Sequence, residues 1–207
     1  IRDSVEGLGS IRNFEKLVSL CDELGKAIVV IKIGKSEHAQ LSAVSHTASL
    51  AGNDKGASAL MKRLGVARVN SLSEFIETLK VFHCHGRLSG SSVASVSCSG
   101  GEASLIADIC NGSQLGFPKL TKEQTNGLNS ALGAKVALAN PLDYHTYIWG
   151  DASKMAQTFI SIMQDKNIDI GIIIVDFPRS DFCDPDAWSC VVELSLIHIS
   201  ETTRPLT

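Results

Sequence analysis

The sequence predicts an α/β protein with two doubly wound parallel sheets, the first of them incomplete. Apolar runs at 27–33, 92–99 and 168–176 each have the length and composition of one buried strand. Segments with apolar residues at helical spacing alternate with these runs. Strands that alternate with helices are typical of a parallel sheet that is covered on both faces.

The first unit is expected to span residues 1–82 in the order βαβαβα. Ser10 and Ser71 are placed to cap helices, and Glu74 completes a capping box with Ser71. Phe14, Leu17, Val18, Leu20 and Cys21 are expected to share one buried helix face. The expected elements are a strand end within 1–9, a helix at 10–24, a strand at 27–33, a helix at 54–64, a strand at 66–69 and a helix at 72–82.

A Gly- and Ser-rich stretch at 83–91 shows no periodicity and is expected to be a linker. His83, Cys84 and His85 within it are metal-ligand types. No second ligand pair follows them at a suitable spacing, so the sequence predicts no metal site.

The second unit is expected to span residues 92–193. A Gly-Gly turn follows its first strand, and Thr121 with Gln124 forms a capping box. The expected elements are a strand at 92–99, a helix at 103–111, a helix from 121 to 132, a strand at 135–139, a helix at 153–164 and an interior strand at 168–176.

Both ends of the chain differ from the pattern between them. The chain opens with Ile1 and not with methionine, which suggests an internal piece of a longer protein. Residues 194–207 resemble translated sequencing-adapter sequence and are expected to lie outside the fold, a genuine tail being the alternative.

Composition narrows the class of protein. The net charge of −3 argues against a nucleic-acid partner, and no apolar run approaches the ~20 residues of a membrane-spanning helix. The six cysteines are scattered without a C-x-x-C pair, which is typical of buried thiols in a reducing cytoplasm.

The loop at 41–52 carries the most specific chemistry. It lies between a strand and a helix, and Ser45 and Thr47 beside His46 are residue types that begin helices. Unpaired N–H groups at a helix N-terminus suit a phosphate, and an imidazole there can accept the group covalently. On spacing alone, a surface-loop histidine remains the alternative.

The stretch GKAIVVIKIGKSEHAQLSAVSHTASLAGNDKGASALMKRLGVARVNSLSEF resembles the ligase domain of nucleoside-diphosphate-forming (NDP-forming) acyl-CoA synthetases. The resemblance implies that His46 is the phosphorylated histidine of that family, with Ser49 where relatives often carry Gly or Ala. Glu6, in the sequence VEGLG, resembles the acid that orients this histidine. Such a carboxylate fixes the imidazole tautomer and leaves the other ring nitrogen free to attack phosphorus.

The second unit resembles the next domain of the same family, with a flavodoxin-like fold. The resemblance implies that Ser99, Gly100, Gly101 and Glu102 stabilise the phosphohistidine from a helix N-terminus, and Glu102 is expected to bond back to the loop or to face a nucleotide-bound Mg²⁺. The loop Asn-Pro-Leu-Asp-Tyr-His makes Asp143 and His145 candidates for the acyl site or for support behind it. A turn stabilised by Asn and Pro is the alternative.

The family resemblance also implies the substrates and the missing parts. These are a small carboxylic acid, CoA, ATP or ADP with Mg²⁺, and CoA-binding and ATP-grasp domains in cis or on another subunit of an oligomer. The chain alone is expected to be inactive. Two other readings stay open: a regulatory ligase-like module of a protein lysine acetyltransferase, and a non-catalytic flavodoxin-like binding module.

Overall fold

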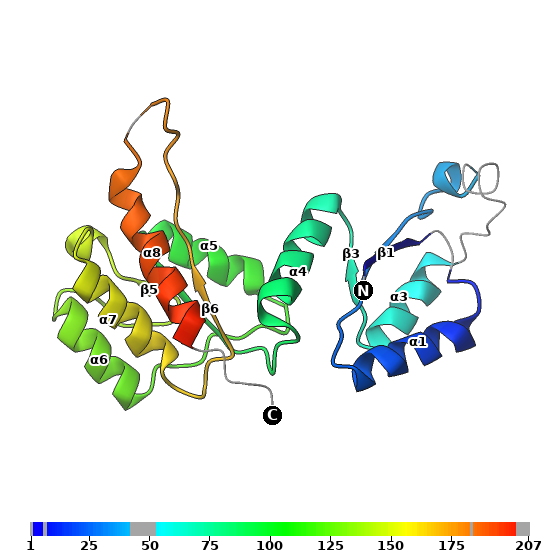
Figure 1. Cartoon of the computed structure of the whole chain (residues 1–207), viewed down its shortest axis with the longest axis horizontal. Helices are drawn as coiled ribbons and strands as arrows, with labels where there is room; N and C mark the ends of the chain where they lie inside the picture. Colours follow the sequence, from blue (N-terminus) through cyan, green and yellow to red (C-terminus); the bar gives the residue numbers. More distant parts are fainter. Residues whose placement is uncertain (1, 6–7, 42–52, 183, 202–207) are drawn as a thin grey trace. The chain divides into compact units, whose positions relative to one another are not determined.

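The computed structural model describes residues 2–5, 8–41, 53–182 and 184–201 (Figure 1). The chain divides into two compact units, residues 1–87 and 88–207. Each unit is a parallel sheet with helices packed on it, so the predicted α/β class is confirmed. None of the described helices is long and apolar enough to cross a bilayer.

The first unit contains a three-stranded parallel sheet in the order β1-β2-β3, with Val30 of the central strand opposite Asp3 and Arg68. Its strands are β1 (Arg2–Val5), β2 (Val29–Lys32) and β3 (Ala67–Val69), and its helices are α1 (Ile11–Glu23), α3 (Asp54–Arg63) and α4 (Leu72–His85). The strand predicted at 27–33 is therefore present, parallel and central.

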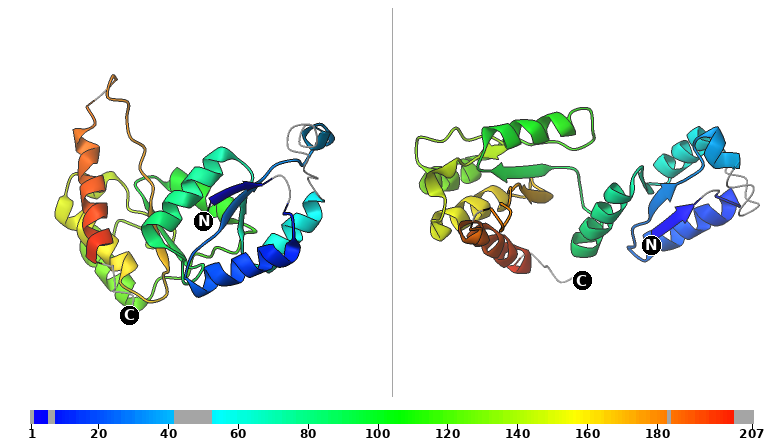
Figure 2. Two further views of the ribbon diagram at one scale, coloured as in Figure 1. Left: turned by 45° about the vertical axis from the view of Figure 1, so that its right-hand side comes forward. Right: turned by 90° about the horizontal axis from the view of Figure 1, so that it is seen from above.

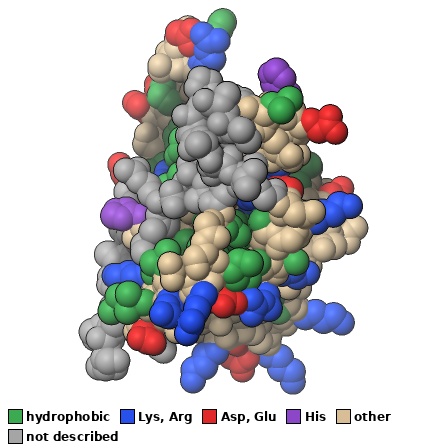
Figure 3. Space-filling view, turned by 90° about the vertical axis from the view of Figure 1, so that its right-hand side faces the viewer, with side chains coloured by type: hydrophobic (Ala, Val, Ile, Leu, Met, Phe, Trp, Pro, Cys, Tyr) green, Lys and Arg blue, Asp and Glu red, His purple; other side chains and the backbone are tan. Residues whose placement is uncertain are grey.

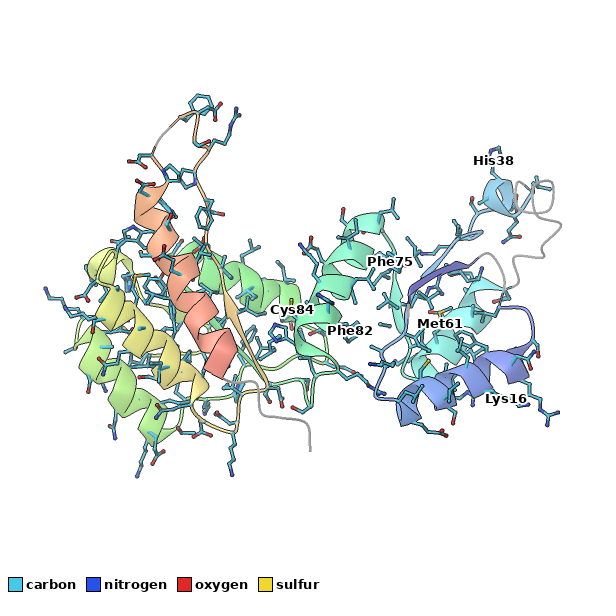
Figure 4. The ribbon with its side chains drawn as sticks, in the orientation of Figure 1. Lys16, His38, Met61, Phe75, Phe82 and Cys84 are labelled. Carbon is cyan, nitrogen blue, oxygen red and sulfur yellow. The ribbon has the colours of Figure 1, made fainter. Side chains whose placement is uncertain are left out.

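Helices cover both faces of this sheet (Figures 1 and 2). Val18 and Cys21 of α1 and Met61 of α3 form one buried cluster with Val30. On the other face, α4 packs against β2 and β3, and Phe75 and Phe82 point from it toward the sheet (Figure 4). Successive residues of a strand face opposite sides, so a single central strand contributes to both layers.

Some local predictions for this unit hold and others fail. Ser10 caps α1 by accepting a hydrogen bond from the Asn13 amide, as predicted. Leu17 and Leu20 are 40% and 52% exposed, so the expected apolar face of α1 is wrong at these two positions. The buried stripe is narrow because the sheet beneath α1 has only three described strands.

Both ends of α4 also differ from the prediction. Ser71 accepts from the Glu74 amide, but the Glu74 carboxylate accepts from the Asn70 amide, one residue before the position that completes a capping box. Helix α4 runs to His85, so residues 83–85 are its last turn and not a linker. No glycine or proline interrupts the helix before Gly86, which ends it with φ +67°.

The second unit contains a parallel sheet in the order β5-β4-β6. Figures 1 and 2 show α5 on one face and α6, α7 and α8 on the other. The elements are β4 (Val93–Ser97), α5 (Gly100–Cys110), α6 (Lys122–Leu132), β5 (Leu142–Asp143), a 3-10 turn (Thr146–Ile148), α7 (Ala152–Met163), β6 (Ile170–Ile173) and α8 (Asp186–Glu201).

The predicted capping box of α6 is confirmed, since Thr121 and Gln124 exchange both hydrogen bonds. The strand predicted at 135–139 is instead β5 at Leu142–Asp143. Asn140 explains the shift: its side-chain amide donates to the carbonyl oxygens of Val93 and Pro118 and accepts from the Ser95 amide. A side chain thus occupies the edge of β4 that a longer β5 would need.

Two further differences concern the position of β6 in the sheet and the length of α8. Strand β6 was expected in the interior and lies at an edge of the described sheet, because β4 takes the central position. Helix α8 continues to Glu201, so the backbone of 195–201 is helical within the segment that was expected to lie outside the fold. No glycine or proline interrupts 186–201.

Candidate functional site

The predicted reactive histidine and its neighbours lie outside the described residues. These are His46, Glu6, Ser45 and Thr47, and their roles remain predictions. The described elements that flank them in the sequence are β1, which ends at Val5, β2, which ends at Lys32, and α3, which begins at Asp54. Residues 37–41, between β2 and the expected loop, are helical.

In the second unit, the Gly-Gly sequence forms the beginning of α5 itself and not a turn before it. Ser99 is the N-cap, and its hydroxyl oxygen accepts a hydrogen bond of 3.2 Å from the Gly101 amide. The Ser97 hydroxyl donates to the Ser99 carbonyl at 3.1 Å and holds the cap in place. The positive end of the α5 dipole therefore lies at the carboxyl end of β4.

Gly100 brings this helix end close to Asp143. A Cβ atom at position 100 would lie 3.2 Å from Asp143 Oδ2, a separation tighter than most side chains tolerate. The other carboxylate oxygen of Asp143 accepts a 2.8 Å hydrogen bond from the His145 amide. The structure thus places Ser99, Gly100 and Asp143 together at the carboxyl ends of β4 and β5.

His145 adopts an uncommon backbone conformation beside this carboxylate. Its φ is +57°, in the left-handed region that non-glycine residues rarely adopt, and its Nδ1 lies 3.6 Å from Asp143 Oδ2. Its ring lies 5.3 Å from that of Tyr147. Strained residues of this kind are concentrated at functional sites, which makes His145 a candidate but assigns it no role.

Carboxylates gather in front of the helix end. Burial raises the pKa of Glu102, and the charges of Asp176 and Asp143 raise it further. Within the part of the chain that the structure describes, Glu102 Oε2 is buried without a hydrogen-bond partner. The expectation that Glu102 bonds back to its loop therefore finds no support at this oxygen. The raised pKa makes Glu102 easier to protonate than an ordinary glutamate, and the protonated form repels an anion less than a carboxylate does.

Two neutral polar groups, Cys98 and Tyr144, interact with these acids. Burial raises the pKa of the Cys98 thiol, with a further contribution from Glu102. Tyr144 is 0% exposed, and its hydroxyl has no hydrogen-bond partner among the described residues. Burial, followed by the nearby Cys98 and Glu102, also raises the Tyr144 pKa. Both groups are thus kept in their protonated forms near neutral pH.

Sequence reasoning missed Cys98, Tyr144 and Asp176 as members of this site. Asp176 follows the apolar run that ends in β6, so its place after a parallel strand was the available signal. Cys98 directly precedes the cap residue Ser99. Among the described residues, no group of three or more His, Cys, Asp or Glu side chains could hold a metal ion.

Replacing Glu102 with glutamine should change how the stability of the chain depends on pH. An acid whose pKa is higher in the folded state binds more protons there, so the free energy of unfolding falls as pH rises from the unfolded glutamate pKa of about 4.3 through the raised folded value. Glu102→Gln should therefore stabilise the chain at pH 7 and have a smaller effect near pH 4. Urea midpoints at the two pH values measure the difference.

Glu123→Gln is the matched control, because Glu123 is an exposed acid in the first turn of α6. It should not produce the pH-dependent gain. An equal gain from both substitutions would show that the environment of Glu102 has no special effect on stability.

Comparison with known proteins agrees with this architecture. Residues 4–82 match the family model described as succinyl-CoA ligase like flavodoxin domain. The alpha subunit of an ADP-forming acetate–CoA ligase II from Pyrococcus furiosus is 30% identical over 174 residues, which cover 84% of this chain and 37% of that protein. An ADP-forming acetate–CoA ligase from Methanocaldococcus jannaschii is 29% identical over 149 residues, which cover 72% of this chain and 20% of that protein.

A solved structure also matches both units. It is a dinucleotide-forming acetyl-coenzyme A synthetase 1 from Candidatus Korarchaeum cryptofilum, in complex with phosphate and ADP. The TM-score is 0.75 at 18% identity, over 97% of this chain and 42% of that one, and this likeness shows the fold. The fold is therefore that of a flavodoxin-like α/β protein. Residues 4–82 belong to the succinyl-CoA ligase like flavodoxin domain family, and the chain is similar to ADP-forming acetate–CoA ligases. It spans about a third of the first relative's length.

Proposed function

We propose that this chain is part of an acid–CoA ligase that interconverts acyl-CoA, phosphate and ADP with acid, CoA and ATP through a phosphohistidine at His46. The observation that carries the proposal is the 174-residue alignment with the alpha subunit of an ADP-forming acetate–CoA ligase, because it runs through both units. We also propose that these units, which meet after α4, are the histidine domain and the following ligase domain.

The proposed reaction proceeds in three balanced steps. Phosphate attacks the acyl-CoA thioester, which forms an acyl phosphate and releases CoA. A ring nitrogen of His46 then attacks phosphorus and releases the free carboxylate. ADP finally accepts the phosphoryl group from His46 and forms ATP. In this scheme Glu6 orients the imidazole, and Ser45 and Thr47 bind phosphate oxygens.

The α5 N-terminus would stabilise the phosphoryl group in the second unit. Gly100 and Gly101 allow a close approach to the backbone of the first helical turn, where the helix dipole favours an anion. The raised pKa of Glu102 makes its protonation easier. Protonation would remove one negative charge near the phosphoryl group at the α5 N-terminus. Asp143 and His145 are proposed to support this site. No group of three or more acidic, His or Cys side chains among the described residues could hold a metal, so Mg²⁺ is assigned to none of them.

The proposal includes partners that supply what this chain lacks. CoA-binding and ATP-grasp domains, in cis or on another subunit of an oligomer, would provide the remaining sites, and we place the enzyme in the cytoplasm. The test uses the complete protein, supplied with ATP, CoA and a panel of short carboxylic acids. ADP release that requires both CoA and an acid is expected. Release that needs neither, or no release with any acid, would favour a non-catalytic module.

A further inference from the structure

A buried lysine lies at the carboxyl end of the central strand of the first unit. Lys32 is the last residue of β2 and is only 3% exposed. Its ammonium group donates a 2.9 Å hydrogen bond to the Ile33 carbonyl. Lysine is almost never fully buried without a specific role, and ligands of parallel α/β sheets bind at the carboxyl ends of strands.

Two more cations lie on segments next to Lys32. Arg68 of β3 is paired with Val30, two residues before Lys32, and Asn70, which binds Lys35, directly follows β3. Burial lowers the pKa of Lys32; Asp54 opposes this shift, whereas Arg68 and Lys35 add to it. Lys35 donates to the Asn70 side chain at 2.6 Å. We call Lys32, Lys35 and Arg68 the cationic cluster.

The N-terminus of α3 adjoins the cationic cluster. Arg68 donates to both the backbone carbonyl and the carboxylate of Asp54, the first residue of α3, at 3.2 and 2.6 Å. The Asp54 carboxylate is therefore engaged by Arg68. The positive end of a helix dipole adds to the potential of the cations beside it, so helix and side chains favour an anion at the same place.

Figure 3 shows one face of the molecule, on which Lys and Arg side chains are intermixed with Asp and Glu. The corresponding edge of the second unit carries the acids Glu102, Asp143 and Asp176. The cationic cluster is thus distinguished by the burial of Lys32, by its sign and by its position at the carboxyl end of a parallel sheet.

We propose that the cationic cluster binds a phosphate dianion, with Lys32 and Lys35 as direct ligands and Arg68 held in place by Asp54. A dianion between the cations would offset their mutual repulsion and stabilise the charged form of Lys32 at its desolvated position. The inference deepens the proposed function, because it names the residues of the first unit that would hold the phosphoryl group before or after its transfer.

Inorganic phosphate titrated into the 207-residue chain tests this site by calorimetry at low ionic strength. Lys32→Met keeps the apolar stem and removes the charge, and it should weaken phosphate binding by about 10-fold or more, as expected for a lost charge-assisted hydrogen bond. Lys35→Met alters an exposed residue that does not support the core, and it should weaken binding several-fold. Lys16→Met, on the exposed surface of α1, should leave binding unchanged.

Separate titrations with ADP and CoA identify the source of the phosphate group. Loss of ADP or CoA binding in Lys32→Met, with inorganic phosphate unaffected, would overturn the proposal, as would wild-type chain that binds no phosphate. Equal affinity in wild type, Lys32→Met and Lys35→Met would also overturn it. These outcomes differ from failure of the proposed function, which is measured by CoA-dependent ADP release from the complete protein.

Discussion

Replacing His46 with asparagine is expected to abolish transfer of the γ-phosphoryl group of ATP to the complete protein. Asparagine retains a polar side chain of similar reach but has no nitrogen lone pair that can attack phosphorus. Radiolabel from ATP that is stable to base and lost in acid should therefore fall to background. Because removal of a nucleophile costs several orders of magnitude in turnover, acid- and CoA-dependent turnover should fall by about 1,000-fold or more.

His38→Asn is the matched control for this experiment. His38 is exposed and belongs to the helical segment 37–41, a few residues before the predicted phosphohistidine (Figure 4). It should accept no phosphoryl group, and its substitution should leave labelling intact. Undiminished label in His46→Asn would place the covalent intermediate elsewhere and remove the basis of the proposed mechanism.

Features that depend on neighbouring residues were predictable from the sequence. The Ser10 cap and the capping box of Thr121 and Gln124 are set by side chains within three residues of the backbone they bind, so local pattern was sufficient. The position of β5 was not predictable in this way. It depends on Asn140, whose partners Val93 and Pro118 lie 47 and 22 residues away in the chain.

In the candidate sites, too, features set by nearby residues were predictable and features set by residues distant in the chain were not. The Gly-Gly sequence before a helix was visible as a motif, and Asp143 could be placed at a strand end. The convergence of Glu102 with Asp176 was not visible, because it requires the strand order β5-β4-β6. Lys32 was hidden for a different reason: one charged residue inside the apolar run AIVVIKI does not disturb the pattern that predicts a strand.

Gln124 connects three segments of the second unit from a fully buried position. It is 0% exposed, and its side-chain amide donates to the Ile162 carbonyl at 2.7 Å and to Asn167 Oδ1 at 3.2 Å. Its side-chain oxygen accepts from the Thr121 amide at 2.8 Å. One side chain therefore completes the cap of α6 and holds the end of α7 and the residue Asn167 against it.

We expect Gln124→Leu to destabilise the second unit by about 3 kcal/mol. Leucine matches the shape of glutamine roughly, but it leaves a buried carbonyl, a cap amide and a side-chain amide without their partners, and each buried unsatisfied group costs about 1–3 kcal/mol. The urea midpoint should fall by about 1–2 M. Both tryptophans of the chain, Trp149 and Trp188, lie in this unit with their rings 5.6 Å apart, so tryptophan fluorescence reports its unfolding selectively.

Gln157→Leu makes the same chemical change at an exposed position of α7 and should shift the midpoint little. The comparison separates the loss of buried hydrogen bonds from the effect of leucine on a helix. If both variants unfold at the wild-type midpoint, the hydrogen bonds of Gln124 are replaced by other partners at little cost. A large loss in Gln124→Leu alone, with an unchanged dependence on urea, would show that this buried amide holds α6 and α7 together beneath the site.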